Sequence, residues 1–148
     1  MKKVLIINGA NMNTLEQRAS LLPGKHSLES IVSEIVEYAR VQNIEIDAFQ
    51  SNHEGAIIDK IQQAPPDCIG IIINPGSFGH YGFGIKEAIA TTSLPCIEVH
   101  IANFFKNPDN VSKIAPVCTG MVSGFGKDSY LVALDALIRI TAPGKGIA

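Results

Sequence analysis

Apolar runs that alternate with segments of helical spacing restrict the folds open to this chain more than any other feature. Val4 to Ile7 contains only aliphatic side chains, and Cys68 to Ile73 carries no charged or amide side chain. Such runs are typical of strands covered on both faces, as in a parallel sheet with helices on each side. Between them, Leu28 to Ala39 repeats apolar residues three and four positions apart, which predicts a helix with Ser27 as its N-cap.

The same alternation continues along the chain. It predicts strands at residues 3–7, 44–49, 68–73, 95–99 and 117–123, and helices at 28–39, 56–63, 83–91 and 130–138. Five strands in 148 residues fit a flavodoxin-like, doubly wound parallel sheet in three α/β/α layers, as a single domain over residues 1–148. The first connection, from Gly9 to His26, is much longer than usual, which favours a functional lid, with plain disorder as the alternative.

Composition excludes several classes of function. The net charge of −2 gives no basic surface for nucleic acid or an anionic membrane, and no apolar run reaches the length of a membrane span. The chain contains neither a GxGxxG motif nor a P-loop, and its histidines match no compact metal-binding spacing, so no cofactor and no metal are expected. The three cysteines lie in or beside apolar runs and indicate reduced thiols in a cytoplasmic protein: Cys68, Cys96 and Cys118.

Polar side chains gather where the predicted strands end. In open parallel sheets, ligands bind beyond the carboxyl ends of the strands, and asparagine side chains there offer both donors and acceptors. Four successive strand ends carry amide, imidazole or carboxylate groups, which favours a site for a polar small molecule. These groups are Asn11 and Arg18 after the first strand, residues 50–54 after the second, Asn74 and His80 after the third, and Glu98, His100 and Asn103 at the fourth.

Glu98 and His100 carry the sharpest chemical hypothesis. They are two positions apart, so in a regular strand both side chains point to the same face. A carboxylate beside an imidazole fixes its tautomer and supports its charged form, which is a standard arrangement for a general acid. An ion pair at the strand end without a catalytic role is the alternative from these two residues alone.

Four motifs in this order and spacing resemble the type II 3-dehydroquinate dehydratases: INGANMNTL, QSNHEG, INPGSFGH and IEVHIAN. The resemblance runs from Val4 to the last predicted helix. It implies a flavodoxin-like subunit that assembles into a dodecamer, a tetramer of trimers. It also implies anti elimination of water from 3-dehydroquinate to give 3-dehydroshikimate, in the shikimate or quinate pathway, without metal or organic cofactor.

The resemblance also implies roles for individual residues. Asn11 matches the asparagine that holds a water against the enolate, and Arg18 matches the lid arginine that keeps a lid tyrosine reactive as the base. His100 matches the acid that protonates the departing hydroxyl, and Glu98 matches the carboxylate that orients it. The substrate-binding positions correspond to Asn74, His80, the backbone at Ile101 and Ala102, and Glu87, which stands where the family usually supplies an aspartate across the trimer interface.

The chain departs from the family pattern in the lid and after the fourth strand. Pro23 occupies the tyrosine position, and a proline side chain cannot accept a proton. The family's Thr-His-Thr-Ser reads here as Gly79-His80-Tyr81-Gly82, which removes hydroxyls that bind substrate in the family. No arginine lies between Arg40 and Arg139, so the arginine that binds substrate downstream of the acid is missing. Lysine does not reproduce a bidentate guanidinium contact.

Three hypotheses follow for this chain. The first is a working dehydratase with a substitute base, for which Tyr81 and His26 are the candidates; packing at the pocket rim and a solvated loop position are the alternatives for these two. The second is an enzyme acting on another polar cyclic acid. The third is a catalytically silent homologue that binds a metabolite or only assembles.

Overall fold

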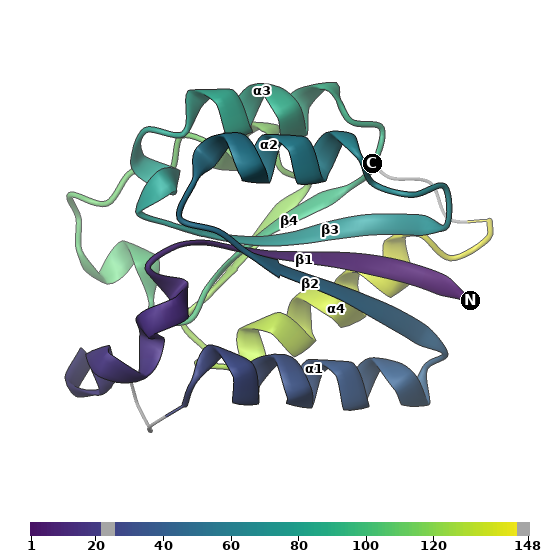
Figure 1. Cartoon of the computed structure of the whole chain (residues 1–148), viewed down its shortest axis with the longest axis horizontal. Coiled ribbons are helices and arrows are strands. Elements are labelled where there is room, and N and C mark those ends of the chain that lie inside the picture. Colours follow the sequence, from purple (N-terminus) through teal and green to yellow (C-terminus); the bar gives the residue numbers. More distant parts are fainter. Residues whose placement is uncertain (22–25, 145–148) are drawn as a thin grey trace.

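The computed structural model of the chain describes residues 1–21 and 26–144, and the side chains of residues 18–21 lie outside this description. Its described part contains one parallel sheet of five strands in the order β2-β1-β3-β4-β5 (Figure 1). This order is the flavodoxin-like arrangement predicted from the sequence. The strands are β1 (Lys2–Ala10), β2 (Ile44–Gln50), β3 (Cys68–Gly76), β4 (Cys96–His100) and β5 (Gly120–Ser123).

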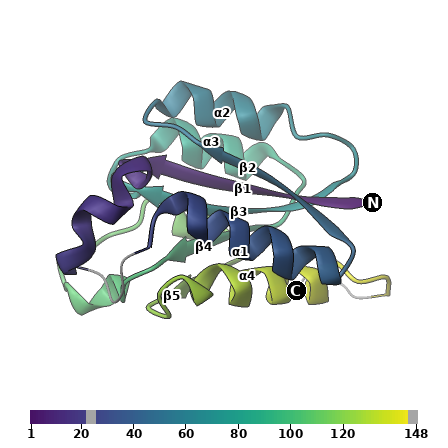
Figure 2. The ribbon, with the colours of Figure 1, turned by 60° about the horizontal axis from the view of Figure 1, so that its bottom comes forward.

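Helices cover both faces of the sheet and complete the three layers (Figures 1 and 2). In the described part of the chain, α1 (Leu28–Val41) and α4 (Asp128–Ile140) pack on one face, while α2 (Glu54–Gln62) and α3 (Phe83–Thr91) pack on the other. All four predicted helices are confirmed, with ends shifted by a few residues. Ser27 caps α1 as expected, because its hydroxyl accepts the backbone N–H of Ser30 at 3.1 Å.

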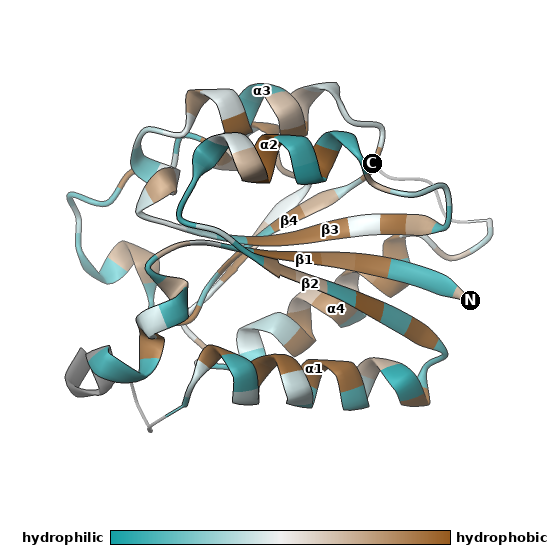
Figure 3. Cartoon of the chain, in the orientation of Figure 1, coloured by the Kyte–Doolittle hydropathy of each residue, from teal (hydrophilic) through white to brown (hydrophobic). Residues whose placement is uncertain are grey.

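The core consists of two apolar layers, one on each side of the sheet. Successive residues of β1 alternate between them: Val4 and Ile6 pack toward α1 and α4, whereas Leu5 and Ile7 pack toward α2 and α3. This alternation follows from the two-residue period of a strand. Because both faces are covered, the central strands are apolar on both sides, as the hydropathy colouring of β1 and β3 shows (Figure 3).

The predicted strand at 117–123 is wrong at its beginning. Ala115–Val117 forms a short 3-10 helix, η4, and β5 starts only at Gly120. Pro116 explains the difference, since proline lacks an N–H and its fixed φ suits the first turn of a helix. The N–H of Cys118 closes this turn on the carbonyl of Ala115 at 3.1 Å.

The long first connection is partly helical. A 3-10 helix, η1 (Met12–Leu21), follows β1 directly, and Met12 and Leu15 are buried in the apolar layer that α1 and α4 share. Pro23, the residue at the lid tyrosine position, lies outside the described residues. The connection therefore starts as a packed segment at the carboxyl end of the sheet.

Two glycines shape the carboxyl end of the sheet. A Cβ at Gly9 would lie 2.0 Å from the carbonyl oxygen of Pro75, so β1 and β3 meet there more closely than any side chain permits. Gly76 has a φ of +59°, a conformation that favours glycine, and it turns the chain from β3 into the 3-10 helix η2 (Ser77–His80). These two positions set where Asn74 and His80 stand relative to β1.

Candidate active site

A hollow of about 230 Å³ opens at the carboxyl ends of β1, β3 and β4. This is the edge of the sheet at which a doubly wound fold is expected to bind ligands. Most of the polar residues singled out from the sequence at β3 and β4 lie in its wall. The described residues that line it are Met12, Leu15, Asn74, Gly76, His80, His100, Ile101, Ala102, Asn103, Phe104 and Asn110.

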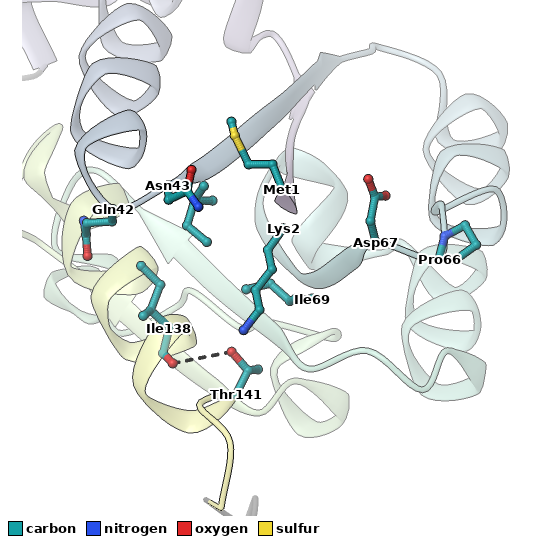
Figure 4. Close-up of a pocket in the computed structure, with 10 residues that line it drawn as sticks. Met1, Lys2, Gln42, Asn43, Pro66, Asp67, Ile69, Ile138 and Thr141 are labelled. Atoms are coloured by element: carbon teal, nitrogen blue, oxygen red, sulfur yellow. Dashed lines mark hydrogen bonds between the residues drawn. The ribbon is translucent and has the colours of Figure 1, made fainter.

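A larger hollow, of about 630 Å³, lies at the opposite end of the sheet among Met1, Lys2, Asn43, Ile138, Thr141 and their neighbours (Figure 4). Its charged lining residues, Lys2 and Asp67, are both exposed. Thr141 already donates its hydroxyl hydrogen to the carbonyl of Leu137 at 2.7 Å. Size therefore favours this hollow, but the convergent buried polar groups that a site needs are at the smaller one.

Glu98 and His100 form a pair at the end of β4, as the two-residue spacing predicted. Glu98 Oε2 lies 2.5 Å from His100 Nε2, and the Glu98 carboxylate is fully buried while the His100 side chain is 12% exposed. The second oxygen, Oε1, accepts the hydroxyl of Ser112 at 2.7 Å, and Ser112 in turn accepts the backbone N–H of Ala115 at 3.0 Å. Both oxygens of the buried carboxylate are thus partnered, which a buried charge requires.

Asn74 is held by a second buried network. Its Nδ2 donates to the hydroxyl of Tyr130 at 3.1 Å, and that hydroxyl donates to Asn8 Oδ1 at 2.5 Å. Asn8 and Asn74 are register partners on β1 and β3, so both amides face Tyr130 on α4. Asn74 Oδ1 also accepts the N–H of Gly76 at 3.2 Å, which fixes the orientation of the amide. Burial raises the pKa of Tyr130, so its hydroxyl keeps its proton.

His80, after β3, and Phe104, in the β4–β5 connection, line one side of the hollow. His80 Nδ1 lies 3.0 Å from the carbonyl oxygen of Val111. The Phe104 ring is tilted against the His100 imidazole at 4.3 Å between centroids and lies parallel to the His80 imidazole at 6.1 Å. Phe104 is buried, with its N–H donated to Ser123 Oγ at 2.7 Å and its carbonyl accepting Asn110 Nδ2 at 2.6 Å.

The structure brings some predicted site residues together and leaves others apart. Asn74, His80, His100, Ile101 and Ala102 line the hollow, and Glu98 supports it from behind. Asn11 lies at the turn after β1 with a φ of +66°, and its N–H is donated to Asn52 Oδ1 at 2.9 Å. The side chain of Arg18 lies outside the described residues. Glu87 is exposed on α3, away from the residues that line the hollow.

The two candidates for a substitute base lie outside the lining set of the hollow. Tyr81 is 52% exposed, and its ring stands edge-on to Phe78 at 5.8 Å between centroids. His26 is half-buried just before α1. Within the described residues, no lysine or arginine lines the hollow, and no group of three acidic, cysteine or histidine side chains is placed to hold a metal ion.

Sequence reasoning missed three residues of the site. Ser112 gave no signal, because a single serine in a connection is common. Tyr130 was read only as part of the apolar face of the last helix. Phe104 belongs to the segment that differs from the family pattern, and an aromatic residue next to the presumed acid was the signal that could have found it.

Comparison with known proteins identifies the family of this chain. Residues 2–138 match the family model described as dehydroquinase class II. The chain belongs to the class II dehydroquinase family. A 3-dehydroquinate dehydratase of Caldicellulosiruptor bescii is 47% identical over 143 residues, which cover 95% of this chain and 99% of that protein. One of Bacillus cereus is 45% identical over 141 residues, covering 94% and 97%.

Solved structures of similar fold agree with this family assignment. The crystal structure of type II dehydroquinase from Butyrivibrio crossotus superposes with a TM-score of 0.88 at 44% identity, covering 92% of this chain and 97% of that one. A 3-dehydroquinate dehydratase-like protein from Bifidobacterium longum gives a TM-score of 0.71 at 26% identity, covering 95% and 98%. In the described part of the chain, no helix is both long and apolar enough to span a membrane.

Proposed function

We propose that this chain removes water from 3-dehydroquinate to give 3-dehydroshikimate, as a hydro-lyase of the shikimate or quinate pathway that acts in the cytoplasm. Its relatives at 45–47% identity carry the name of that activity. The observation that carries the proposal is the buried Glu98–His100 pair at a hollow of about 230 Å³. Elimination of a hydroxyl group needs an acid beside the leaving oxygen, and this pair has the arrangement of one.

His100 is the proposed acid. Because its Nε2 is held by Glu98, its Nδ1 is the nitrogen that gives a proton to the departing hydroxyl. The buried carboxylate accepts the Nε2 hydrogen and fixes the orientation of the ring, so the Nε2 proton stays in place when Nδ1 gives up its own. Asn74, with its amide fixed by Tyr130 and Gly76, and the backbone of Ile101 and Ala102 bind the polar groups of the ring.

The remaining proposed roles come from the family resemblance. Asn11 holds a water against the enolate, and Arg18 supplies charge from the first connection. Glu87 reaches the site of a neighbouring subunit in a trimer-based oligomer, a dodecamer. Pro23 stands where the lid tyrosine is expected, so turnover should be well below that of relatives with that tyrosine.

One observation favours a second candidate, action on a different polar cyclic acid. The β4–β5 connection places the apolar ring of Phe104 in the wall beside the amides of Asn103 and Asn110, and within the described residues no cationic side chain lines the hollow. A cyclic acid with an apolar edge to lie against Phe104 would fit this wall better than a ring that carries hydroxyl groups on every side.

The test is ultraviolet detection of the conjugated product on mixing purified protein with 3-dehydroquinate. We expect measurable product from the wild type and a loss of about a hundredfold to ten-thousandfold in rate for His100→Ala. His53→Ala is the matched control, since His53 is exposed and its side chain makes no capping bond to α2. Absence of product from folded wild-type protein would remove this function and leave the alternative substrate.

A further inference from the structure

We propose that His80 is the general base of this enzyme and that its Nε2 removes the proton from the carbon next to the ketone. This inference rests on the proposed function and deepens it. The need for a base arises from the sequence, since Pro23 replaces the residue that carries this role in the family pattern. A proline side chain holds no atom that can accept a proton.

The lining of the hollow restricts the choice of base. Among the described residues that line it, only His80 and His100 have side chains that exchange protons near neutral pH. His100 Nε2 is engaged by the buried Glu98 carboxylate at 2.5 Å, and His100 is already assigned as the acid of the reaction. His80 is therefore the remaining proton acceptor in the described wall.

The partner of His80 sets which of its nitrogens is basic. A backbone carbonyl can only accept a hydrogen bond, so Nδ1, at 3.0 Å from the Val111 oxygen, must carry the hydrogen. In the neutral ring the lone pair then resides on Nε2. Within the described part of the chain, the contact with Val111 is the one hydrogen bond that the His80 ring makes. Its basic nitrogen is thus not occupied by a neighbouring donor.

The two histidines of the hollow have different hydrogen-bond partners. His100 Nε2 meets a carboxylate and His80 Nδ1 meets a backbone carbonyl, so the geometry suits the first ring to an acid role and the second to a base role. Phe104 neighbours both rings, at 4.3 Å from His100 and 6.1 Å from His80 between centroids.

The reaction balances with these two groups alone. His80 Nε2 takes the proton from carbon, and the electrons of that C–H bond form the enolate. The enolate electrons then form the ring double bond as the C–O bond breaks, and the leaving oxygen takes the proton from His100 Nδ1 to become water. His80 ends protonated and His100 neutral. Because His80 is exposed, it returns its proton to solvent, and His100 is recharged from solvent.

Proton removal can be measured apart from water loss. In deuterated water, an enzyme that forms the enolate exchanges the hydrogen next to the ketone, which proton NMR follows as loss of that signal. His100→Ala blocks the later step, so exchange in this background reports the base alone. We expect His100→Ala to retain exchange and the double variant with His80→Asn to lose it by about a hundredfold or more. An asparagine amide still offers an N–H for the Val111 carbonyl.

The outcomes separate a base from a residue that only binds substrate. Added imidazole should restore exchange in His80→Ala, because it replaces the missing proton acceptor, whereas a lost binding contact would not be repaired this way. His53→Asn is the matched control and should leave exchange unchanged. The proposal is overturned if His80→Asn exchanges normally, or if exchange disappears in Tyr81→Phe or His26→Ala instead. If wild type forms product and His80→Asn exchanges normally, the base assignment to His80 is rejected and the proposed function stands. If wild type shows neither product nor exchange, the proposed function itself is rejected.

Discussion

The hydroxyl of Tyr130 should contribute more to stability than any surface hydrogen bond of this protein. Tyr130→Phe keeps the buried ring and removes one oxygen, which accepts from Asn74 at 3.1 Å and donates to Asn8 at 2.5 Å. Tyr130 is fully buried, Asn8 is 1% exposed and Asn74 is 4% exposed, so water does not readily replace the lost partner. Leaving a buried polar group unsatisfied costs about 1–3 kcal/mol, and two such groups give about 2–4 kcal/mol after partial relaxation.

Urea unfolding followed by circular dichroism measures this loss. All variants should be compared at one protomer concentration, because association changes apparent stability. Tyr38→Phe is the matched control: the same atom is removed, but Tyr38 is 37% exposed and its hydroxyl reaches Asp135 on the surface, so only a small change is expected. A stability of Tyr130→Phe within error of wild type would refute the argument that this hydroxyl satisfies the two amides.

Two further predictions concern the acid and the assembly. Ser112→Ala removes the hydroxyl that Glu98 Oε1 accepts at 2.7 Å, and we expect a loss of about tenfold in kcat with Ser112→Thr close to wild type; equal rates for all three proteins would show that Glu98 positions His100 without this bond. Sedimentation at micromolar concentration should give a mass that is a multiple of three subunits. A monomer under these conditions would contradict both the oligomer and the role of Glu87 across its interface.

Much of the fold could be predicted because the spacing of apolar residues shows which faces of the strands and helices are buried. The continuous apolar runs of β1 and β3 and the helical spacing of α1 together indicate a parallel sheet with helices on both faces. The start of β5 could not be predicted in this way. An apolar run at Val117 is typical of a strand, but Pro116 and the bond from the Cys118 N–H to the Ala115 carbonyl place residues 115–117 in a 3-10 turn.

The candidate site could be predicted where a short spacing along the chain decides contact. Glu98 and His100 are such a case, since a strand places alternate residues side by side. Ser112 and Tyr130 are the opposite case, because each meets its partner only through tertiary structure, 14 and 56 positions away from Glu98 and Asn74. A single sequence carries no periodic signal for contacts of this kind.

The β4–β5 connection has one further consequence, which concerns the length of the chain between its contacts. Val111, whose carbonyl holds His80, and Ser112, whose hydroxyl holds Glu98, are adjacent residues. They are joined by a single peptide bond, so a displacement of Val111 from His80 also displaces Ser112 from Glu98. An insertion, a deletion or a transient opening in this loop would therefore break the His80 contact and the Glu98 contact together. His80 ends η2 and His100 ends β4, yet the contacts that hold these two parts of the site depend on residues joined by one peptide bond.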